Sequence, residues 1–238
     1  DCRVGNYTSS GAGGGKVVTQ GQTTAHGGYV ALLGASVSNE GTSSARLGTV
    51  VLAAGNAMTL DVAGDGLLNL VVNEGAMNAL VQNGGLIRAD GGNVTLTAQA
   101  AGSLMSVVNN TGVLQAQSID TRNGTIRLLG DMQSGTVSVG GTLDASGKGA
   151  GQTGGNVVAT AYHVGVFGGH IDASGDAGGG TVLVGGGYQG GNASVQNASA
   201  TYMSADATTN ADAINTGTGR TVRMATAEPH ACQGTLRA

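Results

Sequence analysis

The best candidates for chemistry in this sequence are two aspartates in equivalent places of a repeated motif. Asp144 lies in Gly140-Gly-Thr-Leu-Asp-Ala-Ser-Gly147, and Asp172 lies 28 residues later in Gly168-Gly-His-Ile-Asp-Ala-Ser-Gly175. Two carboxylates that flank one glycosidic bond are the usual machinery of a glycoside hydrolase. An Asp that precedes small residues and a Gly more often accepts hydrogen bonds from the turn amides of that following Gly. We therefore interpret both residues as turn-forming and predict no catalytic residue in the chain.

The remaining reactive residue types are too scattered to form a site. The fourteen acidic residues are spread along the chain with few basic residues near them, whereas acid–base catalysis needs two groups within reach of one bond. No histidine has a partner at metal-ligand or catalytic spacing; the four are His26, His163, His170 and His230. The sequence thus predicts a protein that is not an enzyme.

Motifs for bound ions and cofactors are also missing. The glycine-rich stretches 147–152 and 178–184 lack the Asp that a calcium-binding repeat requires. The stretch 185–191 is rich in Gly but has no Lys-Ser or Lys-Thr after it, so it is not a phosphate-binding loop. We predict neither a metal nor a cofactor.

Composition restricts both the fold class and the partners. The 46 glycines among 238 residues argue against long helices, because Gly costs about 1 kcal/mol relative to Ala inside a helix. The net charge is −4 and Lys and Arg do not cluster, so the basic surface of a nucleic-acid-binding protein is absent. No apolar run approaches the roughly 20 residues that span a bilayer. We predict an all-β protein without a nucleic-acid partner or a membrane-inserted segment.

A short pattern, Gly-x-Val-x-Leu, recurs along the chain and indicates a repeat protein. Clear copies begin at Gly28, Gly48, Gly92 and Gly124. Alignment of the leading apolar residue of every copy gives steps of 20, 44, 32, 31, 25 and 40 residues between Val30, Val50, Val94, Ile126, Val157, Val182 and Val222. Short strands with this spacing and with Gly, Asn, Asp and Ser turns are typical of a solenoid. We predict a parallel β-helix whose loops vary in length.

The Leu/Ile-Asp-Ala-Ser-Gly motif predicts which side chains face the core. Its alternation places Leu143 and Ala145 inward and Asp144 and Ser146 outward, with Ile171 equivalent to Leu143 in a nearby coil. The competing fold is an antiparallel sandwich or barrel, which four hairpin-like pairs would suit: Asp65-Gly66, Asn83-Gly84, Asp90-Gly91 and Asn123-Gly124. A sandwich, however, gives no reason for one motif to return in one register.

The two cysteines, Cys2 and Cys232, lie at opposite ends of the chain. A disulfide needs Cα atoms within about 7 Å. In a solenoid of about nine coils at about 4.8 Å per coil, the two ends are about 40 Å apart. Unless a tail folds back along the stack, we expect free or intermolecular thiols.

Three longer segments resemble the filamentous haemagglutinin family of two-partner-secreted bacterial exoproteins. They are Gly27-Gly-Tyr-Val-Ala-Leu-Leu-Gly-Ala-Ser-Val-Ser-Asn-Glu-Gly41, Ala45-Arg-Leu-Gly-Thr-Val-Val-Leu-Ala-Ala-Gly55 and Thr59-Leu-Asp-Val-Ala-Gly-Asp-Gly66, and the likeness extends over residues 15–215. The resemblance implies a right-handed parallel β-helix in a single elongated domain. It also implies export through an outer-membrane two-partner secretion transporter, followed by display at the cell surface or release.

The chain departs from the family at two points. The family's secretion domain carries Asn-Pro motifs, but the only proline here is Pro229. We therefore expect the chain to lie after that secretion core or to lack part of it. The last nineteen residues hold this proline, one cysteine and three of the eight arginines, which suggests a frameshifted or foreign tail. We divide the chain into an irregular segment 1–14, a β-helix 15–219 and an atypical tail 220–238.

The resulting functional prediction is a non-catalytic, adhesive β-helical shaft of a large secreted surface protein that attaches to host or neighbouring cells. Its partners would be the transporter and a surface glycan or receptor whose identity the sequence does not give. Two alternatives remain: the stalk of a contact-dependent growth-inhibition toxin, and a polysaccharide lyase or hydrolase built on the same fold. Six Asn-x-Ser/Thr sequons permit glycosylation without requiring it; they begin at Asn6, Asn93, Asn109, Asn123, Asn192 and Asn197.

Overall fold

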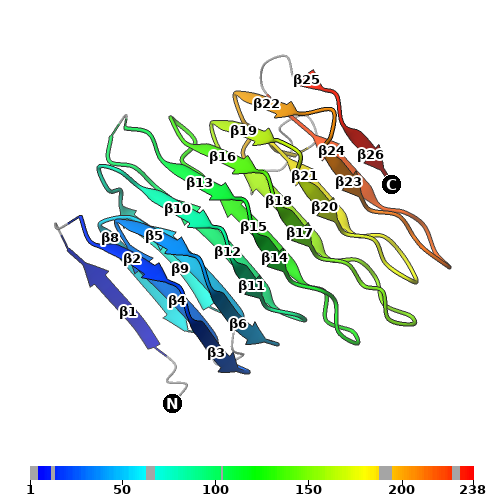
Figure 1. Cartoon of the computed structure of the whole chain (residues 1–238), viewed down its shortest axis with the longest axis horizontal. Coiled ribbons are helices and arrows are strands. Elements are labelled where there is room, and N and C mark those ends of the chain that lie inside the picture. The colour runs from blue at the N-terminus through cyan, green and yellow to red at the C-terminus, as the bar shows by residue number, and fades with distance from the viewer. Residues whose placement is uncertain (1–4, 12–13, 63–67, 103, 188–194, 227–230) are drawn as a thin grey trace.

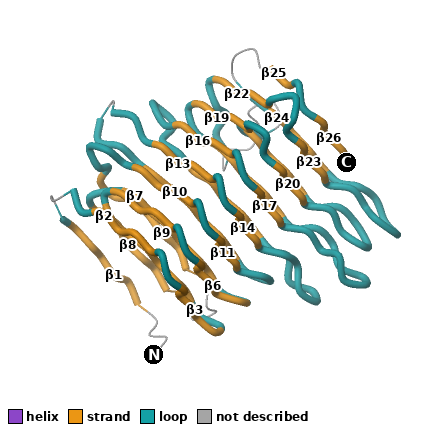
Figure 2. Tube along the Cα trace, viewed as in Figure 1, coloured by secondary structure: helices purple, strands orange, loops and turns teal. Residues whose placement is uncertain are grey.

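The computed structural model describes the chain except for residues 1–4, 12–13, 63–67, 103, 188–194 and 227–230. The regular elements of the described residues are all strands, with no helix among them (Figure 2). The strands stack along the long axis, and the two ends of the chain lie at opposite ends of the stack (Figure 1). Each coil adds one strand to each of three parallel sheets. The fold is therefore a right-handed parallel β-helix, as predicted.

Seven complete coils and the first two strands of an eighth form the three sheets. Sheet I contains β2 (Lys16–Thr19), β5 (Ser36–Asn39), β10 (Leu80–Asn83), β13 (Val107–Asn110), β16 (Thr136–Val139), β19 (His163–Val166), β22 (Ala200–Met203) and β25 (Ala231–Cys232). Sheet II contains β3 (Gln22–His26), β6 (Thr42–Arg46), β11 (Leu86–Arg88), β14 (Val113–Gln115), β17 (Thr142–Asp144), β20 (His170–Asp172), β23 (Thr208–Asn210) and β26 (Thr235–Arg237). Sheet III contains β4 (Tyr29–Gly34), β7 (Thr49–Ala54), β12 (Asn93–Ala98), β15 (Thr125–Leu129), β18 (Asn156–Thr160), β21 (Thr181–Val184) and β24 (Thr221–Met224).

Sheet III is built from the recurring Gly-x-Val-x-Leu pattern, and its register is the one that the sequence alignment predicts. The aligned residues pair from strand to strand in one unbroken row: Val30, Val50, Val94, Ile126, Val157, Val182 and Val222. From Val50 to Val182 these side chains are completely buried. Each coil thus adds an apolar side chain to one continuous core, because a strand that keeps its register keeps its inward face.

Sheet II confirms the register of the second repeat. Leu143 pairs with Ile171, and Asp144 pairs with Asp172 on the next coil. Leu143 and Ile171 are completely buried in the core, while the two aspartates project from the opposite face of the same strands. The expected alternation is therefore confirmed for Leu143, Asp144 and Ala145. Ser146, expected to face outward, is buried instead, and its hydroxyl donates to Asp144.

The 44-residue step between Val50 and Val94 contains an insertion that forms a separate sheet. In this antiparallel sheet, β8 (Ala57–Val62) pairs with β1 (Gly5–Ser10) on one side and with β9 (Leu68–Glu74) on the other. Its apolar face packs on the outer face of sheet III, where Met58 and Leu68 contact the cluster around Val51 and Ala53. This cover explains why all six residues of β7 are buried.

A buried ladder of three asparagines lies between sheets I and II. Asn39, Asn83 and Asn110 are the last residues of β5, β10 and β13. The Asn39 amide nitrogen donates to Asn83 Oδ1, and the Asn83 amide nitrogen donates to Asn110 Oδ1, at 2.7 Å each. On the next coil Val139 takes this position, so the ladder ends there. The ladder satisfies polar groups at a corner that excludes water.

The structure differs from the expected boundaries at both ends of the chain. Residues 5–10, expected to be irregular, form β1, because they pair antiparallel with β8. Residues 221–224 and 235–237, expected to belong to an atypical tail, form β24 and β26 and continue sheets III and II in register. Val222 keeps the apolar position of its row, so the coil pattern continues although the composition changes. Pro229 lies outside the described residues.

The hairpin-like pairs of the competing sandwich fold occupy corners of coils. Asn83-Gly84 follows β10, Asp90-Gly91 lies between β11 and β12, and Asn123-Gly124 precedes β15, and all of these strands pair in parallel. Asp65-Gly66 lies outside the described residues, between the antiparallel strands β8 and β9.

Candidate functional site

The outer face of sheet II carries the aspartates that the sequence singles out. The strand pairing places Asp144 and Asp172 in one row that runs across the coils. In order, its members are Thr24, Ser44, Arg88, Gln115, Asp144, Asp172, Asn210 and Arg237. Hydrogen bonds join neighbouring coils: the Gln115 amide donates to Asp90 at 2.9 Å. The Gln117 amide donates to Asp144 Oδ2 at 2.7 Å. The row is a network of polar contacts along the stack.

Both candidate aspartates form the turn that the sequence predicts. Asp144 Oδ1 accepts hydrogen bonds from the backbone N–H of Ser146 at 3.0 Å and from its hydroxyl at 2.6 Å. Asp172 Oδ1 accepts the same pair from Ser174, at 2.9 and 2.6 Å. These are Asx turns, which fix the direction in which the chain leaves the strand. The donors are the Ser residues two positions on from each Asp, and not the following Gly, as the sequence suggested.

Asp172 has a second partner that distinguishes it from Asp144. Its Oδ2 lies 2.8 Å from the ammonium nitrogen of Lys148, which belongs to the loop between β17 and β18. Burial by itself would raise the pKa of the Asp172 carboxyl, but the hydrogen bonds from Lys148 and Ser174 outweigh it and hold this pKa below its ordinary value. The same hydrogen bond raises the pKa of Lys148. Both groups therefore stay charged at neutral pH.

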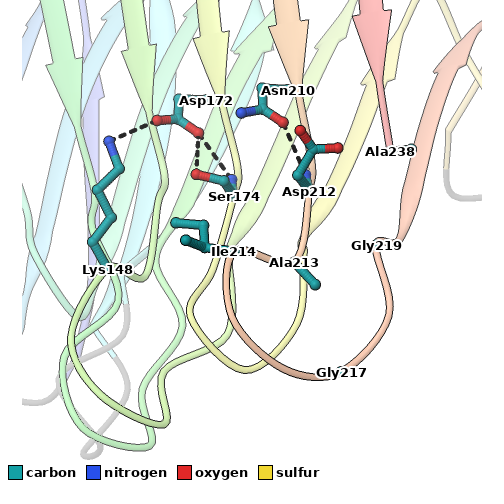
Figure 3. A pocket seen from close by; sticks show the side chains of 10 residues that line it. All are labelled: Lys148, Asp172, Ser174, Asn210, Asp212, Ala213, Ile214, Gly217, Gly219 and Ala238. Atoms are coloured by element: carbon teal, nitrogen blue, oxygen red, sulfur yellow. Dashed lines mark hydrogen bonds and ion pairs between the residues drawn. The ribbon is translucent and has the colours of Figure 1, made fainter.

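A polar groove of about 590 Å³ opens beside this ion pair, near the C-terminal end of the stack (Figure 3). Asp212 contributes a second carboxylate from the next coil, where its backbone N–H donates to Asn210 Oδ1 at 2.9 Å. The residues that line the groove are Lys148, Asp172, Ser174, Asn210, Asp212, Ala213, Ile214, Gly217, Gly219 and Ala238. Asp144, although it stacks on Asp172, does not line it.

The side chains of this groove can bind polar groups of a ligand or hold the surrounding loops in place. A general acid must hold a proton near neutral pH, which requires a raised carboxyl pKa. The pKa of Asp172 is lowered, and its two oxygens are occupied by Ser174 and Lys148. Nowhere in the described part of the chain do three or more His, Cys, Asp or Glu residues gather as a metal site would need.

The stacked loops around the groove are held together by a neighbouring carboxylate. Asp176 Oδ2 accepts the backbone N–H of Gly151 at 2.7 Å, and Oδ1 accepts the Asn215 amide at 2.6 Å. The three residues belong to loops of three successive coils. These hydrogen bonds lower the pKa of Asp176, the one from Gly151 most strongly. The acidic residues of this region thus order loops.

Sequence reasoning missed Lys148 and Asp212 as parts of this region. Asp212 takes the place of Ser146 and Ser174 one coil further on, but Thr209-Asn210 replaces Leu/Ile-Asp there, so the motif is not recognisable. Lys148 is one of only two lysines and follows the first copy of the motif directly. The position of Lys148 directly after the motif was the signal from which its place in this region could have been predicted.

An aromatic cluster of two ring pairs lies along β19 and β22 of sheet I, with Tyr162 directly before β19 and Phe167 directly after it. The rings of Phe167 and Tyr202 have centroids 5.4 Å apart, and those of Tyr162 and His163 are 4.6 Å apart. Phe167 is 53% exposed, and Tyr162 and Tyr202 are 36% exposed each. Gly165 pairs with Tyr202, and a Cβ on Gly165 would collide with the Phe167 ring. This cluster holds three of the six Phe and Tyr residues of the chain.

The other reactive residues stay apart. Among the histidines, His163 belongs to the aromatic cluster, and Nδ1 of His170 contacts the Thr208 hydroxyl. His26 ends β3 on an early coil, and His230 lies outside the described residues. Cys232 is a free, exposed thiol, while Cys2 lies outside the described residues.

Comparison with known proteins connects the fold to a family. A family model described as the TPS secretion domain matches residues 4–143. The crystal structure of the HMW1 secretion domain from Haemophilus influenzae is similar, with a TM-score of 0.71 and 25% sequence identity. This match covers 94% of the present chain and 66% of that chain, so our chain spans about two thirds of its length. No curated protein gives a significant match.

The family match corrects one expectation drawn from the missing Asn-Pro motifs. The chain does not lie wholly beyond the secretion domain, since residues 4–143 match that domain directly. A β-helix is specified by the spacing of Gly and inward apolar residues, and this spacing survives without a proline.

No helix in the described part of the chain is long and apolar enough to cross a membrane.

Proposed function

Because the chain belongs to the family of TPS secretion domains, we propose that it directs a larger exoprotein to its outer-membrane transporter and then forms the first coils of a surface-exposed shaft. Two-partner export and a partner transporter follow from the family itself. That the protein lies at the cell surface and forms part of a shaft is what we propose in addition. The observation that carries it is the match over residues 4–143 on a parallel β-helix.

A β-helix can fold progressively while the chain emerges from a pore. Each coil contacts only the coils before and after it, so coils can form one by one as the chain emerges. The antiparallel sheet pairs β1 with β8, which follows the second coil. This sheet can therefore form before the later coils have emerged. Export from the N-terminal end would therefore complete the stack without threading.

The test is transporter-dependent release. The 238-residue chain, fused behind a cleavable signal peptide, is produced with and without a two-partner secretion transporter of the HMW1 type. We expect folded protein in the medium only with the transporter. A matched chain of residues 144–238, outside the family match, should stay in the periplasm. Equal release of both chains, or release without the transporter, would contradict the proposal.

The second part of the proposed function is adhesion, which the aromatic cluster supports. Exposed aromatic faces give large contact area at low conformational cost and are common at recognition sites. Phe167 directly follows β19 and Tyr202 lies on the adjacent strand β22, so the two rings offer one surface to a glycan or receptor on another cell. Phe167→Ala combined with Tyr202→Ala should reduce cell attachment at least several-fold, and Val113→Ala, at an exposed apolar residue of β14, serves as the control. Unchanged attachment would remove this cluster from the adhesive role.

We further propose that the protein has no catalytic activity. The family is of a non-enzymatic kind, and the lowered pKa of Asp172 is the reverse of what a general acid needs. Incubation with acidic polysaccharides should release no reducing ends or unsaturated products. Release that Asp172→Asn abolishes would overturn this proposal and favour a polysaccharide lyase or hydrolase.

A further inference from the structure

The antiparallel sheet ends in an unprotected edge strand. In the order β1-β8-β9, β9 pairs on one side only, so backbone groups along its other side have no strand partner among the described residues. Proteins usually blunt such edges with charged residues or proline. β9 reads Leu-Asn-Leu-Val-Val-Asn-Glu, and its one charged residue is Glu74 at the end of the strand; residues 68–72 contain neither. At the other edge, β1 reads Gly-Asn-Tyr-Thr-Ser-Ser, which is mainly polar.

A groove of about 420 Å³ runs beside this free edge. Its wall is apolar and is formed by Leu68, Leu70 and Val72 of β9. Its floor is the outer face of sheet III on the next two coils, with Thr95 and Thr97 from β12 and Leu129 from β15. Strands in a sheet and coils in this stack share a spacing of about 4.8 Å. One additional strand beside β9 would therefore lie over the floor and fill the groove.

The groove also contains one uncompensated positive charge. Arg127, on the outer face of β15, lines it and is exposed. Among the described residues its guanidinium has no ion-pair or hydrogen-bond partner. An occupant that reaches this point with a carboxylate gains a charge-assisted contact, whereas one with a lysine is repelled.

We propose that β9 is a docking edge for an extended strand of another protein. The occupant pairs its backbone with residues 68–72, turns alternate apolar side chains into the groove and places one Asp or Glu at Arg127. Backbone pairing supplies affinity, and the alternate side chains supply selectivity, as in other cases of strand addition. The inference concerns the folded chain and does not depend on the route of export.

The test uses the folded 238-residue chain and a capped heptapeptide, Val-Thr-Glu-Thr-Val-Thr-Val. Amide hydrogen exchange should slow at least tenfold at residues 68–72 when the peptide is saturating. A peptide with Lys in place of Glu should bind more weakly, and one with alternate backbone amides N-methylated should not bind. Arg127→Glu should weaken binding of the Glu peptide about tenfold and favour the Lys peptide. Arg223→Glu, in the same row three coils away, is the control.

Three results would overturn the proposal. The first is no protection at residues 68–72, or equal binding of the N-methylated peptide. The second is equal affinity of the Glu peptide for the Arg127→Glu variant. The third is a peptide-independent dimer that protects the same residues, because the occupant would then be a second copy of this chain.

Discussion

At the residue scale, Leu143 and Asp144 are chain neighbours with opposite surroundings. Leu143 is completely buried between Leu114 and Ile171 of the adjoining coils. Asp144 lies on the outer face and accepts hydrogen bonds from Ser146 and Gln117. A single position along the strand therefore decides between the apolar core and the polar row.

We expect Leu143→Asp to lower the free energy of unfolding by roughly 3–5 kcal/mol, because it buries an unpaired carboxylate between apolar neighbours. Asp144→Asn keeps an oxygen acceptor for Ser146 and should cost less than about 1 kcal/mol. Urea unfolding followed by circular dichroism measures both. Equal losses would mean that the assigned register of β17 is wrong.

The ion pair between Lys148 and Asp172 predicts a dependence of stability on pH. Because folding lowers the Asp172 pKa, its contribution is present above the unfolded value of about 3.9 and is lost as the pH falls through the folded value. Because folding raises the Lys148 pKa, its contribution is present below about pH 10.4 and is lost as the pH rises through the folded value.

Thermal unfolding of Lys148→Met should therefore differ from that of the wild type between about pH 5 and 9, and the difference should shrink below about pH 4. Lys16→Met, at the other lysine of the chain, is the matched control and should show no such window. A difference that persists unchanged at pH 2 would assign the effect to packing of the lysine stem.

At the element scale, the asparagine ladder adds side-chain hydrogen bonds between three coils whose strands also pair through the backbone. Asn83 is its central member: it accepts from Asn39 and donates to Asn110. Asn83→Ala should cost roughly 2–4 kcal/mol, because it removes both bonds and leaves buried polar groups on the neighbouring coils. Asn109→Ala, one residue before the ladder and on the outer face of β13, should change the unfolding midpoint little. Similar losses for the two variants would argue against the ladder.

How much of these elements the sequence predicts depends on how local the signal is. The row from Val30 to Val222 follows from a pattern within five residues, so both the strands of sheet III and their register could be predicted. The antiparallel sheet could not, since β1 has no apolar alternation and its partner β8 lies about fifty residues away in the chain. In the candidate site, the Asx turns followed from a local motif. The contact between Lys148 and Asp172 could not be predicted, because it depends on the path of the loop that carries Lys148.

At the scale of the whole molecule, the coils act as nearly interchangeable units. Val107 and Thr136 pair in register, so removal of residues 107–135 joins two equivalent points of successive coils. We expect this variant to fold as a shorter β-helix, in which Asn83 faces Val139 as Asn110 does now. A deletion of residues 107–121 removes only part of a coil and joins points that are not equivalent, so it should abolish folding. The cooperativity of urea unfolding and the strand signal in circular dichroism distinguish these outcomes.

The stacking direction also determines how the molecule responds to tension. Hydrogen bonds between coils run along the long axis, so a pull on the two ends loads the inter-coil contacts in series. Contacts in series carry the same force, so a terminal coil, which is paired on one side only, yields first and is peeled from the stack. A coil of 29 residues such as 107–135 then lengthens from about 4.8 Å to about 100 Å of extended chain. A protein anchored at one end and attached to another cell at the other would thus behave as an extensible tether that absorbs a sudden load one coil at a time.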